Sequence, residues 1–99
     1  MCGIVGQWNR TTSVNATLFD AMRDTLTHRG PYGFGTHIST DGQLALGHRR
    51  LSFLDLGENG KQPLCNEDGT IWTTFNGEIY NYLELRAELK EKGHVFKSH

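Results

Sequence analysis

The chain has 99 residues, of which 36% are hydrophobic and 21% charged, a composition typical of one small soluble domain. Its formal net charge of −1 gives no electrostatic reason to expect binding to nucleic acid or to an anionic membrane. No apolar run approaches the roughly 20 residues that span a bilayer, and no secretory signal opens the chain, so we expect a cytoplasmic protein.

The first third of the chain predicts a strand followed by a helix. The apolar run from Cys2 to Trp8 favours a buried strand that begins at the terminus itself. A helix is predicted from Asn15, a plausible N-cap, to about Thr27, and Gly30-Pro31 should stop it. The apolar face expected for this helix contains Leu18, Phe19, Met22 and Leu26.

The middle of the chain predicts two hairpins. Strands at 34–39 and 44–48 are joined by Asp41-Gly42, a dipeptide that favours a tight hairpin turn. A second hairpin turns at Asp68-Gly69, with 71–75 as its outgoing strand.

A second helix is predicted near Asn81, where Asn81 and Glu84 resemble a capping box, and Gly93 should follow its last turn. Residues 94–97 begin another predicted strand. Helices and mostly antiparallel strands in this order predict an α+β layered sandwich. The apolar face expected for the second helix contains Tyr82, Leu85 and Leu89.

Cys2 is the first candidate for chemistry. Removal of Met1 would leave a thiol and a free α-amine on one residue, with ordinary pKa values of ~8.5 and ~7.7–8.0. The amine can then take a proton while the sulfur attacks a carbonyl. The alternative is a cysteine without a role, as we expect for Cys65, and a disulfide between the two is not expected in a reducing compartment. The five histidines show no ligand spacing, so no metal site is expected.

Two further segments carry polar groups suited to amide chemistry. Asn76-Gly77 is either an ordinary hairpin turn or a strand-to-helix turn whose side-chain amide and backbone N–H form an oxyanion hole. In Arg49-Arg50, one guanidinium can clamp an α-carboxylate, although an arginine at a strand end is most often a solvated surface residue. Strand alternation places the two side chains on opposite faces, and the residues alone do not decide between them.

Five segments taken together resemble, in order and spacing, the N-terminal glutaminase domain of glutamine-hydrolysing asparagine synthetase. That domain is a class II glutamine amidotransferase of the N-terminal-nucleophile hydrolase fold, so the resemblance implies a layered αββα sandwich. The segments that carry it are Met1-Cys2-Gly3-Ile4-Val5-Gly6, His28-Arg29-Gly30-Pro31, Gly47-His48-Arg49-Arg50-Leu51-Ser52, Gln62-Pro63-Leu64 and Phe75-Asn76-Gly77-Glu78-Ile79-Tyr80-Asn81.

The resemblance implies a role for each matching residue. Cys2 corresponds to the nucleophile, and Asn76 and Gly77 correspond to the oxyanion donors. Arg50, and not Arg49, corresponds to the arginine that holds the glutamine α-carboxylate, so substitution of Arg49 should matter little for glutamine binding. The implied substrate-binding residues are Arg50, Leu51, Ser52, Phe53, Leu54 and, near the substrate amine, Glu78.

The resemblance also implies the wider setting. Residues 1–99 correspond to the N-terminal part of the amidotransferase domain, with the rest of that domain and the synthetase domain absent. This domain needs no cofactor, whereas ATP and magnesium serve the synthetase domain, which receives the ammonia released from glutamine. A homodimer of the full-length protein is compatible with the resemblance. Tyr32 departs from the family, which usually has Asp there, and this change removes one expected loop anchor.

Two other functions remain open at this stage. The chain could be a non-catalytic amidotransferase-like domain that binds or regulates, or a truncated fragment without a stable active fold. The intact Cys2, Arg50 and Asn76 favour the enzyme, whereas Tyr32 and the early end of the chain favour the alternatives. We therefore expect the isolated chain to be inactive in glutamine hydrolysis.

Overall fold

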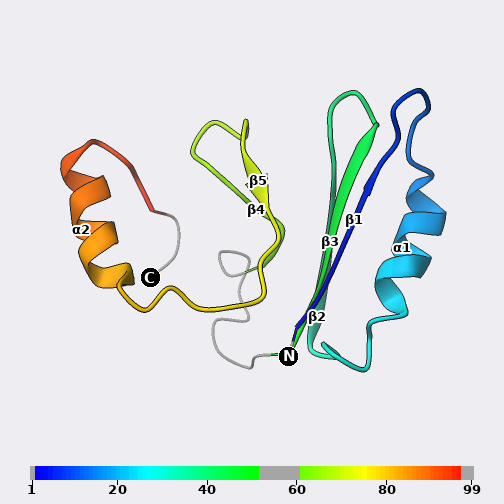
Figure 1. The fold of residues 1–99 in the computed structure, drawn as a ribbon, viewed down its shortest axis with the longest axis horizontal. Helices are drawn as coiled ribbons and strands as arrows, with labels where there is room; N and C mark the ends of the chain where they lie inside the picture. The colour runs from blue at the N-terminus through cyan, green and yellow to red at the C-terminus, as the bar shows by residue number, and fades with distance from the viewer. Residues whose placement is uncertain (1, 52–60, 97–99) are drawn as a thin grey trace.

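The computed structural model describes residues 2–51 and 61–96. Two helices and five strands lie in these ranges, and the strands form two small antiparallel sheets (Figure 1). In chain order the elements are β1 (Gly3–Trp8), α1 (Ala16–Asp24), β2 (Gly33–Ile38), β3 (Leu44–Arg50), β4 (Leu64–Cys65), β5 (Trp72–Thr73) and α2 (Tyr82–Glu91).

The larger sheet has the strand order β1-β3-β2 and is antiparallel throughout. β3 is the central strand: Arg49 pairs with Gly3 of β1 and with Phe34 of β2. The turn between β2 and β3 contains Gly42 at φ 75°, a left-handed conformation that glycine adopts at little cost. The predicted β2–β3 hairpin is therefore confirmed. The N-terminal strand is also present, but it is not buried as predicted, since Ile4 is 48% and Trp8 67% exposed.

The smaller sheet consists of β4 and β5, which are joined by a turn with Gly69 at φ 74°. The predicted turn is confirmed, but the strand expected over 71–75 is shortened to Trp72–Thr73. The Trp72 indole stacks on the His37 ring of β2, with ring centroids 3.6 Å apart and planes 7° apart. This stack joins the hairpin to the larger sheet.

The hydrophobic core lies between α1 and the larger sheet, and the Phe19 side chain at its centre is completely buried. The Asn15 side chain accepts a hydrogen bond from the Leu18 amide at 3.0 Å, which confirms the predicted N-cap. Gly47 of β3 allows the close approach, since a Cβ there would lie 3.1 Å from the Phe19 ring. Val14 and Ala45 complete the buried apolar cluster.

The predicted inner face of α1 was wrong in part. Leu18 is 64% exposed and Met22 43% exposed, whereas Arg23 is buried beside Phe19. Arg23 fits there because Asp20, Asp24 and Thr36 accept hydrogen bonds from its guanidinium. A four-residue apolar spacing does not anticipate a buried charged residue that bonds two carboxylates of its own helix and Thr36 of β2.

The second helix is present, but two expectations about it fail. The Asn81 side chain makes no capping hydrogen bond, and α2 buries none of its residues, so its predicted apolar face is exposed. Gly93 does follow the helix at φ 94°, as predicted. Residues 94–96 form no strand, and His94 instead contacts the Glu67 carboxylate at 2.9 Å.

From one side to the other, Figure 1 shows α1, the larger sheet, the β4–β5 hairpin and α2. The predicted mixed α+β class is confirmed, with antiparallel sheets. Helix α2 buries none of its residues, so the described residues do not form a complete four-layered sandwich. Within the described residues, no helix is long and apolar enough to cross a membrane.

Candidate active site

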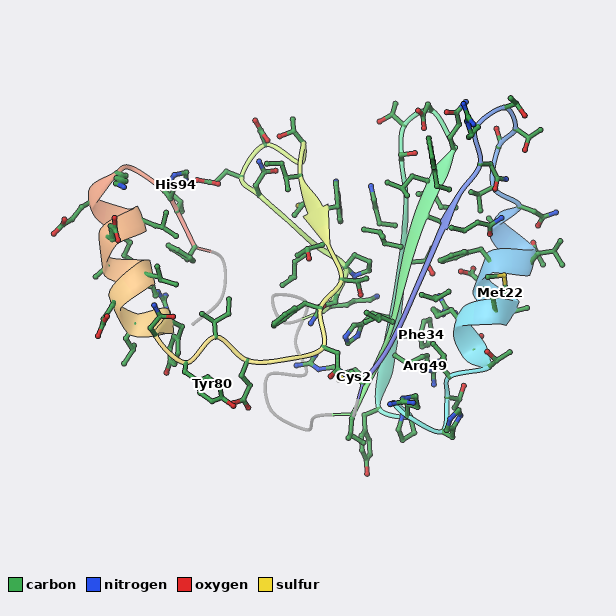
Figure 2. All side chains as sticks on the ribbon, viewed as in Figure 1. Cys2, Met22, Phe34, Arg49, Tyr80 and His94 are labelled. Carbon is green, nitrogen blue, oxygen red and sulfur yellow. The ribbon has the colours of Figure 1, made fainter. Side chains whose placement is uncertain are left out.

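Cys2 lies at the end of the larger sheet, immediately before β1 (Figure 2). Since Gly3 pairs with Arg49, the antiparallel register places Cys2 level with Arg50. The Leu51 amide donates a weak hydrogen bond to the Cys2 sulfur at 3.5 Å. The thiol is free and half-buried, so the nucleophile candidate is held beside the arginine that the family resemblance selects.

The two faces of β3 separate the neighbouring arginines, as strand alternation predicts. Gly47 and Arg49 face α1, because a Cβ on Gly47 would meet Phe19 and the Arg49 guanidinium contacts Asp24. Arg50 therefore projects to the opposite face, the one that the β4–β5 hairpin contacts through the stack of Trp72 on His37. Cys2 belongs to that face by the same alternation along β1.

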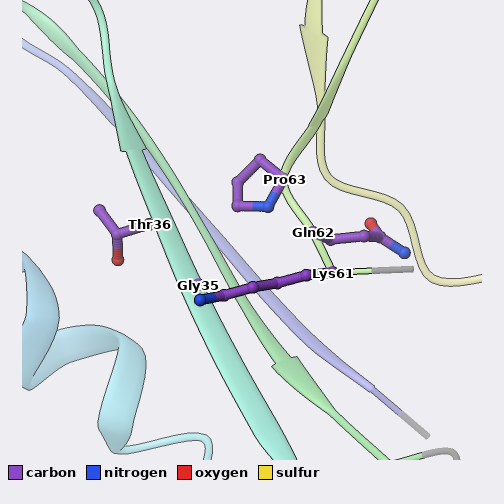
Figure 3. A pocket seen from close by; sticks show the side chains of 5 residues that line it. All are labelled: Gly35, Thr36, Lys61, Gln62 and Pro63. Carbon is purple, nitrogen blue, oxygen red and sulfur yellow. The ribbon is translucent and has the colours of Figure 1, made fainter. Parts of the chain in front are cut away.

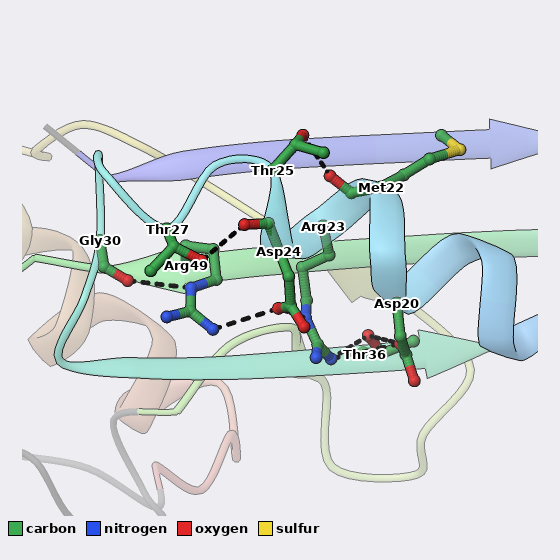
Figure 4. A network of polar contacts seen from close by, with 9 residues as sticks. All are labelled: Asp20, Met22, Arg23, Asp24, Thr25, Thr27, Gly30, Thr36 and Arg49. Carbon is green, nitrogen blue, oxygen red and sulfur yellow. Dashed lines mark hydrogen bonds and ion pairs between the residues drawn. The ribbon is translucent and has the colours of Figure 1, made fainter.

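Arg49 is not a solvated surface residue, which corrects the general expectation for an arginine at a strand end. That Arg49 matters little for glutamine binding stays a prediction. Only 8% of it is exposed, and its Nε donates to the Gly30 carbonyl at 3.0 Å (Figure 4). One of its terminal nitrogens lies 3.1 Å from the Asp24 carboxylate. Its guanidinium lies 5.3 Å from the centre of the Phe34 ring, and that of Arg23 lies 4.6 Å from it.

Asp24 connects the two buried arginines. Its carboxylate accepts a hydrogen bond from Arg23 at 3.0 Å and one from Arg49 at 3.1 Å. The Arg23 hydrogen bond is the main cause that lowers the pKa of Asp24, and the positive charges of both guanidinium groups add to it. The network therefore stays charged at neutral pH and fixes the end of α1 to β3.

This network also anchors the loop that carries Tyr32. A side chain at Gly30 would overlap the Arg49 backbone, so the loop lies directly on β3. The Tyr32 amide donates to the Arg50 carbonyl at 3.0 Å. The Gly30 carbonyl and the Tyr32 amide thus tie the loop to Arg49 and Arg50, and Arg50 lies level with Cys2.

Asn76 and Gly77 follow β5 in a connection that leads to α2 and not to a returning strand. The ordinary hairpin reading is therefore wrong, and the strand-to-helix connection is confirmed. The Thr74 hydroxyl donates to the Gly47 carbonyl at 3.2 Å, and the Phe75 amide donates to the Gln62 side chain at 2.6 Å. These contacts bring the residues just before Asn76 onto the sheet that carries Cys2.

His48 is a residue of this face that the sequence reasoning passed over. It is 3% exposed, and its Nε2 has no hydrogen-bond partner within the described part of the chain. Burial lowers the pKa of His48, the Arg50 charge lowers it further, and the Phe75 backbone partly opposes these effects. Its position two residues before Arg50 was the available signal, since alternation places both on one face.

The remaining predicted substrate residues lie apart or outside the described ranges. Leu51 is exposed at the end of β3, and Ser52, Phe53 and Leu54 lie outside the described residues. Glu78 lines a surface hollow of about 470 Å³ with Ile79, Tyr80 and Tyr82, to which the larger sheet contributes no residue. Cys65 is a half-buried free thiol in β4. Across residues 2–51 and 61–96, no cluster of three or more metal-ligating side chains occurs.

Comparison with known proteins decides the family. Residues 1–99 match the family described as "Glutamine amidotransferase domain". The chain belongs to this glutamine amidotransferase family. The amidotransferase chain is 46% identical to glutamine-hydrolysing asparagine synthetase 1 of Bacillus subtilis (strain 168) over 102 residues, which cover 99% of the chain and 16% of the relative.

Two other relatives show the breadth of the family. A probable glutamine-hydrolysing asparagine synthetase of Dictyostelium discoideum is 44% identical over 102 residues, covering 100% of the chain and 18% of the relative. A protein of Gibberella zeae called amidase chry2 is 41% identical over 69 residues, covering 70% of the chain and 10% of the relative. The chain thus spans less than a fifth of each of these proteins.

Proposed function

We propose that this amidotransferase chain, joined to the remainder of its domain, hydrolyses glutamine to glutamate and ammonia, with the Cys2 thiol as nucleophile. The observation that carries the proposal is the family match over residues 1–99, in a chain whose Cys2 lies level with Arg50 at one end of the sheet. In the first step the Cys2 sulfur attacks the side-chain carbonyl of glutamine, and the α-amine freed by removal of Met1 takes the thiol proton.

The remaining steps use the other candidate residues. The Asn76 side-chain amide and the Gly77 N–H donate hydrogen bonds to the oxyanion that develops on the carbonyl oxygen. The carbon–nitrogen bond breaks, and the ammonium group of Cys2 returns its proton to the departing ammonia. Water then attacks the γ-glutamyl thioester, which releases glutamate and restores the thiol.

Arg50 supplies substrate recognition in this proposal. A planar guanidinium donates two parallel hydrogen bonds to a carboxylate, which suits the α-carboxylate of glutamine. The neighbouring Arg49 is unsuited to this role because its guanidinium is already bound to Gly30 and Asp24. Glu78 and the segment from Leu51 to Leu54 would complete the pocket.

We propose further that the ammonia passes to an ATP- and magnesium-dependent asparagine synthetase domain. The similarity to the asparagine synthetases of Bacillus subtilis and Dictyostelium discoideum supports this acceptor. The protein called an amidase carries less weight than these two relatives, because the similarity to it extends over only 70% of the chain.

The test uses a hybrid in which this chain replaces the aligned segment of the Bacillus subtilis asparagine synthetase. We expect the hybrid to release glutamate and ammonia from glutamine, and Cys2→Ala to abolish the release. Cys65→Ala is the matched control and should leave the rate nearly unchanged, because its thiol lies in β4. Glutamine hydrolysis that survives in the Cys2→Ala hybrid would refute the proposed nucleophile.

A further inference from the structure

The segment that carries Asn76 and Gly77 leaves its sheet early. β5 pairs with β4 at Thr73 and Trp72, and among residues 2–51 and 61–96 no strand pairing extends beyond Thr73. A segment outside a strand pairing is held only by individual side-chain and backbone contacts. These contacts must fix its position if its hydrogen-bond donors are to stay in place. The contacts of the two residues before Asn76 therefore decide where the candidate oxyanion donors lie.

Gln62 makes one of the contacts to Phe75, the residue directly before Asn76, and His48 makes another through the Phe75 backbone. Its side-chain oxygen accepts a hydrogen bond from the Phe75 amide at 2.6 Å, a short distance for an N–H donor. The Thr74 hydroxyl, one residue earlier, donates to the Gly47 carbonyl at 3.2 Å. Phe75 directly precedes Asn76, so the Gln62 bond fixes the backbone at the entry to the turn.

The backbone of Gln62 is itself fixed to the larger sheet. A side chain at Gly35 of β2 would overlap the Gln62 carbonyl oxygen, so the two backbones are in direct contact. The Gln62 side chain extends from there away from β2 and toward the segment that follows β5 (Figure 3). A hollow of about 180 Å³ lies beside this contact, lined by Gly35, Thr36, Lys61, Gln62 and Pro63.

We propose that Gln62 is a positioning residue, whose side-chain oxygen holds the Phe75 amide and thereby fixes Asn76 and Gly77 relative to the sheet that carries Cys2. The positional part of this inference stands on the contacts alone. Its consequence for the reaction rests on the proposed glutamine hydrolysis. Gln62 touches no reacting atom in this account and acts through the backbone of Phe75.

The positional part is tested by amide hydrogen exchange on the full 99-residue chain. Gln62→Met keeps the length of the side chain but removes the acceptor, whereas Gln62→Glu keeps an acceptor oxygen. Gln43→Met is the matched control, because Gln43 lies in the β2–β3 turn and bonds Asn9 and Asp41 through its backbone. Amides of β3 report whether the fold as a whole is retained.

We expect the Phe75 amide to exchange about tenfold faster in Gln62→Met, with Asn76 and Gly77 following it. Gln62→Glu should restore slow exchange, and Gln43→Met and the β3 amides should remain at their original rates. Exchange at Phe75 that stays within about twofold of the original rate in Gln62→Met, with β3 protected, overturns the proposal. A loss of protection in β3 as large as that at Phe75 also overturns it, because Gln62 would then support the whole fold.

The consequence for the reaction is tested in the hybrid with the Bacillus subtilis relative. Misplaced oxyanion donors reduce the stabilisation of the transition state more than they reduce substrate binding. Gln62→Met should therefore lower kcat about tenfold or more with KM nearly unchanged. A rise in KM alone would overturn the role in positioning the donors. A hybrid that never hydrolyses glutamine overturns the proposed function instead, and the exchange rates still decide whether Gln62 holds Phe75.

Discussion

Replacing Arg49 with lysine should destabilise the protein although the charge is kept. The single ammonium group of lysine cannot bond the Gly30 carbonyl and the Asp24 carboxylate together, as the forked guanidinium does at 3.0 and 3.1 Å. The Gly30 bond is buried, so its loss should cost ~2 kcal/mol, within the range for hydrogen bonds to charged groups. Water screens the half-exposed Asp24 carboxylate, so the ion pair adds little to this effect.

The assay is thermal unfolding followed by circular dichroism. For a domain of this size, ~2 kcal/mol lowers Tm by roughly 8–16 °C. Arg29→Lys is the matched control, since Arg29 is exposed one residue before Gly30 and should shift Tm very little. Equal Tm values for Arg49→Lys and Arg29→Lys would refute the argument that the buried network holds the Gly30 loop on β3.

Three further variants test other parts of the account. In the hybrid, Arg50→Lys should weaken glutamine binding by ~1–3 kcal/mol, measured as a raised KM, and an unchanged KM would contradict the carboxylate clamp. The pKa of His48 in the folded state lies below its ordinary value, so on acidification the unfolded chain takes up this proton at a higher pH than the folded chain does. The free energy of unfolding should therefore fall as the pH drops below about 6.5. Urea unfolding at pH 7 and pH 5 measures this loss of stability. His48→Gln should reduce the loss but not abolish it, because burial also lowers the pKa of His37. An undiminished loss in this variant would exclude His48 as its source. Phe19→Ala should cost ~3–5 kcal/mol in urea unfolding because the ring is completely buried, and a cost near that of a surface substitution would refute its place at the core.

Local signals in the sequence predicted most of the elements correctly. Asp41-Gly42 and Asp68-Gly69 mark turns whose glycines adopt positive φ, and Asn15 caps α1 as its side chain allows. These features depend on a few neighbouring residues, so a sequence reading can recover them. Helix α2 was also found, but its Asn81 makes no capping bond because the existence of a helix does not determine how its first turn is satisfied.

The inner face of α1 and the role of Arg49 could not be read from spacing. Arg23 is buried because Thr36 of β2 and two nearby carboxylates accept its hydrogen bonds, and only the fold brings Thr36 to it. Arg49 is buried because Gly30 and Asp24, far away in sequence, lie on the face of β3 that it occupies. The same limit applies to Gln62, which meets Phe75 across 13 residues.

The candidate site divides in the same way. Alternation along the strand separated Arg49 from Arg50, and the resemblance selected Arg50. The structure places Arg50 level with Cys2, because Gly3 pairs with Arg49. Alternation places His48 on the face of Arg50, but its burial could not be predicted, because that depends on segments far away in sequence such as the one that carries Phe75. The roles of Asn76 and Gly77 remain predictions that require a measurement of the reaction.

The most direct test of the central claim is to trap the covalent intermediate. The hybrid is mixed with glutamine, quenched in acid during turnover, and its N-terminal peptide is analysed by mass spectrometry. The account predicts that Met1 is absent and that a γ-glutamyl group is attached to the Cys2 sulfur, and that Cys2→Ala carries no such group. A glutamyl group on Cys65, or turnover by a protein that retains Met1, would contradict the claim that Cys2 is the nucleophile and its α-amine the base.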